Sequence, residues 1–154
     1  MHGCYNSGDF QKYFNENMED LGLPVPSSLF DTYQTAVATA ATLVGTLATL
    51  GKGATMGELI GATVGLEKLA VAASFGASAY VGAVIGSIAV ASGRSLGCGY
   101  RISDMFAFLE HNNLKFDNWN AFYVQNPQVL DKNHSFRNSF GLRAKTSSVS
   151  SEYA

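Results

Sequence analysis

The pattern of hydrophobic and polar positions divides the chain into an amphipathic beginning, an uncharged middle and an aromatic-rich end. In the first part, hydrophobic residues recur at helical spacing, at Phe10, Tyr13, Phe14, Met18 and Leu21. Ser7 is suited to cap the start of this helix and Gly22 to end it. Residues 23–26 contain two prolines and cannot continue it, so we expect a new helix near Ser28, which forms a capping-box pattern with Asp31.

The middle of the chain contains two long uncharged stretches. Residues 32–51 carry no charge, and at about 1.5 Å per helical residue they reach roughly 30 Å, the thickness of a bilayer's hydrocarbon core. The second stretch, residues 69–93, is bracketed by Lys68 and Arg94, as expected for charges held at lipid headgroups. The pattern predicts two weakly hydrophobic spans in a helical hairpin.

Small residues recur in the middle at four-residue steps. Gly53, Gly57, Gly61 and Gly65 form an uninterrupted ladder, and Ala41, Gly45 and Thr49 extend it backwards. A glycine inside a helix costs about 1 kcal/mol relative to alanine, so the ladder needs a compensating gain. Close helix packing in lipid supplies one. A second ladder contains Ala70, Ser74, Ser78, Gly82 and Gly86, and we expect both ladders to pack helices.

Threonines form a separate stripe in the first uncharged stretch. They follow one another at steps of three and four residues, which place them on one face of a helix: Thr32, Thr35, Thr39, Thr42, Thr46 and Thr49. Their hydroxyls could bond across helices or line a narrow wet path in an oligomer. We favour the path, with Thr35 to Thr49 as the candidate pore-lining residues.

The last part returns to ordinary amphipathic patterning. Ile102, Met105, Phe106 and Leu109 predict a helix that begins near Ser103. A second, aromatic-rich helix contains Trp119, Phe122 and Tyr123 and ends before Pro127. The prediction is an all-α fold with a central glycine-rich helical hairpin flanked by amphipathic helices. Its single domain comprises an N-terminal helix and linker (1–27), the hairpin (28–93), a helical C-terminal segment (94–144) and a flexible tail (145–154).

Composition narrows the classes of function. Of the 154 residues, 47% are hydrophobic and only 14% are charged, and the net charge is −2. This balance argues against a nucleic-acid partner, which usually meets a clustered basic face. The first thirty residues also lack the apolar run of a secretory signal peptide, so we expect export by another route.

Candidate catalytic groups are scattered. The pairs Cys98 with His111 and Cys4 with His2 would offer a thiol and a base, and the possible third members are Asp104, Glu110 and His134. No motif of a known catalytic family surrounds them, and the histidines lack the spacing of zinc ligands. We therefore expect no enzyme activity, no cofactor and no metal. Whether Cys4 and Cys98 pair with each other stays open.

The glycine zipper from Gly53 to Gly65, set between two weakly hydrophobic spans in a small chain, resembles the pore-forming antibacterial effectors of type VI secretion, in particular the small Tse-type toxins carried inside the Hcp tube. The resemblance covers mainly residues 28–93. It implies delivery into a rival bacterium, insertion into its inner membrane and a homo-oligomeric ion-conducting pore that dissipates the membrane potential. It also implies a cognate immunity protein in the producing cell.

Two blander interpretations use the same residues. The glycines and threonines could pack a non-conducting membrane anchor or an oligomeric structural protein, or they could pack helices within a soluble bundle. The first predicts membrane binding without current, and the second predicts close helix contacts inside one chain.

Overall fold

All regular secondary structure in the described part of the chain is helical, which confirms the predicted all-α class. The computed structural model describes residues 9–51, 53–93, 101–116, 118–131 and 136–145. The α-helices are α1 (Phe10–Asp20), α2 (Tyr33–Leu50), α3 (Met56–Ala62), α4 (Ala77–Ala91), α5 (Ile102–Asn112), α6 (Trp119–Gln125) and α7 (Ser139–Lys145). Short 3-10 helices are η1 (Ser27–Leu29), η2 (Glu67–Ala72) and η3 (Pro127–Val129).

Local side-chain chemistry sets several helix ends. At the end of α1, Gly22 has a φ of 82°, a conformation that suits glycine, as predicted. Ser7, the predicted cap at the start of that helix, lies outside the described residues. A helical element does begin near Ser28, as predicted, but it is the short 3-10 helix η1, and the next α-helix starts later. Helix α2 begins after Thr32, whose hydroxyl accepts a hydrogen bond from the Thr35 amide at 3.0 Å.

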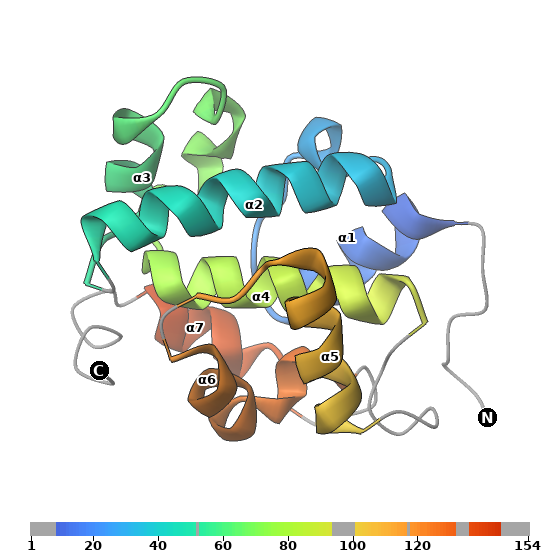
Figure 1. Cartoon of the computed structure of the whole chain (residues 1–154). Helices are drawn as coiled ribbons and strands as arrows, with labels where there is room; N and C mark the ends of the chain where they lie inside the picture. The colour runs from blue at the N-terminus through green and yellow to red at the C-terminus, as the bar shows by residue number, and fades with distance from the viewer. Residues whose placement is uncertain (1–8, 52, 94–100, 117, 132–135, 146–154) are drawn as a thin grey trace.

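The central hairpin consists of α2 and α4. Figure 1 shows these two helices side by side and running in opposite directions, with α3 and η2 forming a small pair near the end of α2. Helix α1 packs against α4, and α6 and α7 lie on the side of α4 away from α2 (Figure 1). The flanking segments of the chain therefore enclose the second helix of the hairpin.

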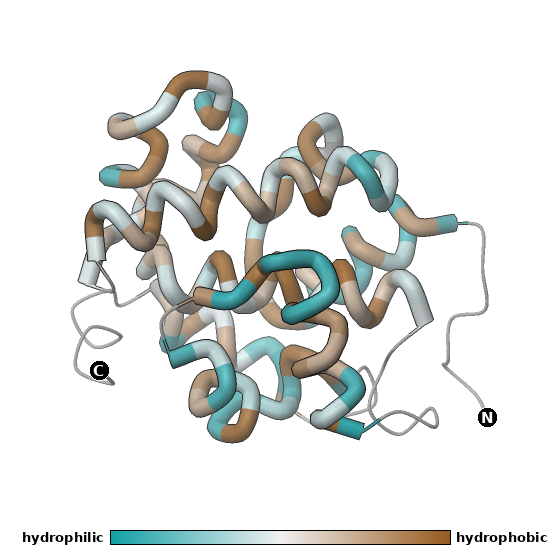
Figure 2. The backbone as a smooth tube through the Cα atoms, in the orientation of Figure 1, coloured by the Kyte–Doolittle hydropathy of each residue, from teal (hydrophilic) through white to brown (hydrophobic). Residues whose placement is uncertain are grey.

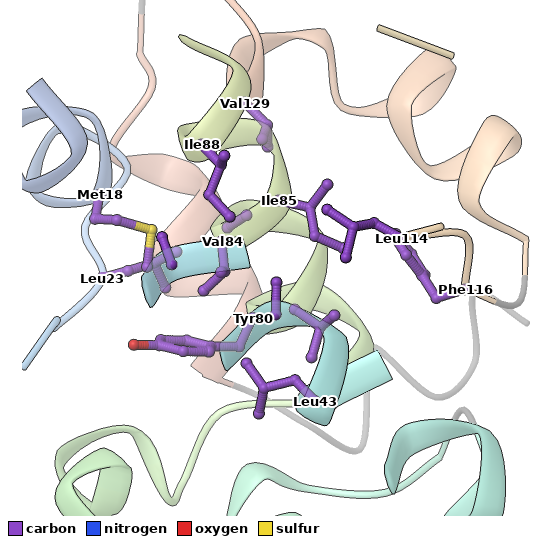
Figure 3. Packing of buried hydrophobic residues seen from close by; sticks show 14 of the residues in the cluster. Met18, Leu23, Leu43, Tyr80, Val84, Ile85, Ile88, Leu114, Phe116 and Val129 are labelled. Atoms are coloured by element: carbon purple, nitrogen blue, oxygen red, sulfur yellow. The ribbon is translucent and has the colours of Figure 1, made fainter. Parts of the chain in front are cut away.

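The hydrophobic core is built around α4. Figure 3 shows Val84, Ile85 and Ile88 of α4 surrounded by side chains from α1, α2 and the C-terminal segment. Among these neighbours are Met18, Leu43 and Val129. The Tyr80 hydroxyl donates a hydrogen bond to the Pro24 carbonyl at 2.7 Å and so holds the linker after α1 against the core. The core is one cluster whose axis is a single helix.

Candidate functional site

Helix α4 is enclosed on every side. Each residue from Tyr80 to Ala91 is buried, and only Ser78 and Ala79 in the first turn are partly exposed. The helix carries no charged side chain. A helix that is apolar around its whole circumference belongs in the core of a protein or in a membrane. In this fold the surrounding helices supply the apolar environment.

Two glycines let the C-terminal segment approach α4. A Cβ atom on Gly82 would lie 2.4 Å from Cε2 of Phe122, and one on Gly86 would lie 2.3 Å from Cγ1 of Val129. Real Cβ atoms are not found so close to another heavy atom, so a larger residue forces a shift at either position. The Tyr123 hydroxyl also donates to the Gly82 carbonyl at 2.7 Å. Gly82 and Gly86 thus act as packing glycines within the monomer.

The first glycine ladder does not lie on one helix in this structure. Gly53 is in the turn before α3, Gly57 and Gly61 are in α3, and Gly65 follows α3 with a φ of 99°. The Gly57 amide donates to the Ala73 carbonyl at 2.9 Å, which brings α3 against the chain after η2. A Cβ atom on Gly61 would meet nothing within 4 Å. Of Gly57, Gly61 and Gly65, only Gly57 has a close backbone contact among the described residues.

The outer face of α2 is uncharged and built of small residues. The exposed side of the helix consists of Gln34, Ala38, Ala41, Thr42, Gly45, Ala48, Thr49 and Leu50. Figure 2 shows that the hydrophilic colour on α2 is confined to its first turn. A Cβ atom on Gly45 would meet nothing within 4 Å, although a glycine inside a helix costs about 1 kcal/mol relative to alanine. The monomer makes no packing use of this glycine.

The candidate pore-lining threonines bond mainly to the backbone of their own helix. The hydroxyls of Thr42, Thr46 and Thr49 donate to the carbonyls four residues earlier, at 3.2, 2.9 and 3.3 Å. Thr39 differs, because it is buried and donates to the Leu29 carbonyl at 3.0 Å, which fixes η1. Thr35 completes the cap at the start of the helix by accepting from Thr32 at 2.9 Å. The stripe thus has structural partners in this fold.

The second predicted span is divided in this structure. Residues 69–93 contain most of η2, a turn at 73–76 and the whole of α4. Hydrogen bonds hold the turn, because the Met56 amide donates to the Phe75 carbonyl and the Ala77 amide to the Ala54 carbonyl, both at 2.9 Å. Lys68 is exposed in η2, and Arg94 lies outside the described residues. As folded here, none of the helices in the described ranges combines the length and the apolar character that crossing a membrane requires.

A buried polar cluster went undetected in the sequence. Asn17 of α1 donates to the Ser87 hydroxyl of α4 at 2.9 Å and to the Val129 carbonyl at 3.2 Å. Arg137, only 6% exposed, donates to the Asn17 side-chain oxygen and to the Gln128 carbonyl. In the sequence, Ser87 stands out as a hydroxyl residue in an otherwise apolar run, but no neighbouring residue identifies its hydrogen-bond partners.

The candidate catalytic groups are not assembled into a site by the described residues. Asp104 accepts the Arg101 amide at 2.6 Å at the start of α5, and Glu110 and His111 are exposed near the end of that helix. Over the ranges that the structure covers, no three histidine, cysteine or carboxylate groups are placed to hold a metal ion. The other candidate groups lie outside those ranges, so the structure does not bear on the thiol and base pairs that contain them: His2, Cys4, Cys98 and His134.

No family model matches this chain. Neither the curated proteins nor the solved structures contain a significant match.

Proposed function

We propose that the protein is an antibacterial toxin that inserts into the inner membrane of a target bacterium and oligomerises into an ion-conducting pore. The observation that carries the proposal is the enclosure of α4, a helix without charge whose side chains are apolar apart from the hydroxyls of Ser78, Tyr80 and Ser87. The backbone groups of α4 are satisfied within the helix and its apolar surface suits lipid as well as it suits the covering helices, so a bilayer can replace those helices around it. In this proposal the folded form is the state before insertion.

Helix α2 supports the same proposal. Its 18 residues contain no charged side chain, and three of its exposed threonine hydroxyls already bond to their own helix. Moving those hydroxyls into lipid leaves no donor without an acceptor, which removes much of the usual cost of burying a polar group. The small outer face of α2 would then pack against other copies, with Gly45 at the point of closest approach.

The resemblance to type VI secretion effectors adds a delivery route for the toxin and a protein that protects the producing cell. A chain of this kind would be produced in the cytoplasm and carried out in the Hcp tube of type VI secretion. A cognate immunity protein would protect the producing cell. The partners at the site of action would be membrane lipids and further copies of the chain.

Planar-bilayer recordings test the proposal. Purified protein should produce discrete current steps, and Gly61→Leu should abolish them because the ladder could no longer bring helices close together. Gly61→Leu should still fold in water, because Gly61 is exposed and has open space around it. Current steps that survive the substitution would remove the first ladder from the pore.

The alternative function is a non-conducting membrane anchor or an oligomeric structural protein. The exposed Gly45, with open space beside it, would serve this alternative in the same way, whereas the packing of Gly82 and Gly86 inside the monomer is what the soluble bundle predicts. Sedimentation with liposomes in the absence of any current would support that alternative. A protein that neither sediments with liposomes nor changes their conductance would overturn both membrane proposals.

A further inference from the structure

We infer that the polar cluster around Arg137 is a clasp that holds the C-terminal segment closed over α4, and that its opening precedes insertion. The clasp is defined by the side chains of Asn17, Asp20, Ser87 and Arg137 and by the backbone carbonyls of Gln128 and Val129. Its role in closure stands on the contacts of the folded chain. Its role in insertion rests on the proposed function.

The clasp joins four parts of the chain that are far apart in sequence. Arg137 reaches α1 through the Asn17 side-chain oxygen and through Asp20, whose carboxylate lies 3.4 Å from Nη1. Its Nε donates to the Gln128 carbonyl at 3.0 Å. Asn17 continues the connection to Ser87 in α4 and to the Val129 carbonyl. The chain before α4 and the chain after it are therefore tied together across the buried helix.

The position of the clasp matches the segment that must leave. The carbonyls that it holds belong to residues 128 and 129, and Val129 is also the residue packed against Gly86 of α4. Apolar contacts such as that one tolerate small displacements. Hydrogen bonds to a buried guanidinium are directional and are lost within a small displacement. The clasp thus fixes the position of residues 119–131, which we call the cover of α4. Without the clasp, these residues are held to α4 mainly by non-directional packing.

The choice of polar side chains suits an interface that opens. A buried ionic cluster contributes little net stability compared with apolar residues of the same volume, whereas removing one member is strongly destabilising. On opening, Arg137 and Asn17 become solvated, and Asp20 is already largely exposed in the closed fold. The Ser87 hydroxyl can bond to a carbonyl of its own helix, as Thr42 and Thr46 do in α2. No group is left unsatisfied once the cover has moved.

Hydrogen exchange on the full chain without lipid tests the clasp independently of any pore. In Arg137→Gln, amides of α4 and of residues 119–131 should exchange at least about tenfold faster than in the wild type, because buried acceptors lose their donor. Arg101→Gln is the matched control, since Arg101 is exposed, and it should exchange as the wild type does. Unchanged exchange at α4 in Arg137→Gln would overturn the clasp.

A milder variant covers the case in which Arg137→Gln does not fold. Asp20→Asn keeps an acceptor but removes the charge at the exposed end of the clasp, where the Asp20 side chain is 58% exposed. It should accelerate exchange in the same segments by a smaller factor. If Arg137→Gln does not fold and Asp20→Asn exchanges at the wild-type rate, Arg137 is a structural residue only and the clasp is overturned.

Dye release from liposomes tests the link to insertion. Arg137→Gln should release dye several-fold faster than the wild type and reach the same final extent, whereas Arg101→Gln should match the wild type. Faster exchange with an unchanged release rate would show that opening of the clasp does not precede insertion. A wild type that releases no dye would overturn the proposed function, and the exchange measurement would still decide whether the clasp closes the fold.

Discussion

At the scale of single residues, glycines at the same spacing have different environments. Gly82 and Gly86 lie under Phe122 and Val129, so their missing side chains are used inside the monomer. Gly45 and Gly61 have open space where a side chain would be. Four-residue spacing places glycines on one face only where the chain forms a single helix, as at Gly82 and Gly86, and it contains no information on what packs against that face. The two groups should therefore respond in opposite ways to the same substitution.

Gly45→Ala should raise the free energy of unfolding by roughly 0.5–1 kcal/mol, because alanine loses less conformational entropy in a helix and meets no neighbour here. Gly86→Ala should lower it by about 1–3 kcal/mol, because the new Cβ overlaps the Val129 side chain. Urea denaturation of the two variants measures both changes. Equal shifts of the same sign would contradict the packing described for Gly86.

Two buried tyrosines make stability sensitive to alkaline pH. Desolvation raises the pKa of the Tyr80 and Tyr123 hydroxyls above the usual value of about 10. The unfolded chain therefore loses these protons first, and stability should fall as pH rises above about 10, by up to about 1.4 kcal/mol per pH unit for each tyrosine. Urea midpoints between neutral pH and pH 11 measure the slope. The double variant Tyr80→Phe with Tyr123→Phe should have a flatter slope, and an equally steep one would assign the effect to other groups.

At the scale of elements, local patterns predicted some helices and missed the division of the second span. Apolar spacing predicted α1, α5 and α6, since each turns a face with buried residues toward the core. Residues 69–93 contain no charge or proline that marks the turn at 73–76. The turn is held by amides and carbonyls of residues 54–57, a tertiary effect that no local pattern contains. The clasp was missed for the same reason, because Asn17 and Arg137 are 120 positions apart.

The divided span gives a prediction that separates the two states. Ser74 is exposed in the folded chain, so Ser74→Asp should change the free energy of unfolding by less than about 0.5 kcal/mol. If η2 and α4 join into one span in lipid, the same carboxylate enters the membrane at a cost of up to about 3 kcal/mol, and dye release should slow at least fivefold.

The control for this substitution is Ser103→Asp, which places the same charge on an exposed position of α5. It should leave the release rate unchanged. Equal release from Ser74→Asp and from the wild type would show that residue 74 stays outside the bilayer.

At the scale of the whole molecule, the proposed conversion separates the cover from the helix it encloses. Trp119 at the start of α6 is the single tryptophan of the chain and is half-buried. Its ring meets Phe106 of α5 edge to face, with centroids 4.7 Å apart. The tryptophan thus reports on the cover without any added label.

Adding liposomes should make Trp119 more accessible to acrylamide, because α6 would separate from α5 as residues 119–131 lift from α4, which breaks the contact with Phe106 and leaves α6 on the aqueous side. Stern–Volmer quenching with and without liposomes measures the change. Vesicles that are permeabilised while the quenching constant stays the same would contradict a separation of α6 from α5.

The contact between α7 and the chain after α1 also affects how the protein folds during translation. The Gly141 amide donates to the Leu21 carbonyl at 2.7 Å, and a Cβ atom on Gly141 would overlap the backbone of Gly22. This joint forms only after α7 has left the ribosome, whereas α2 and α4 emerge earlier. A nascent chain therefore carries its most apolar helix without its final cover for the seconds that translation of the remaining residues takes. A ribosome that stalls after α4 has emerged and before α7 has left it would hold that helix open to chaperones or to the host's own bilayer.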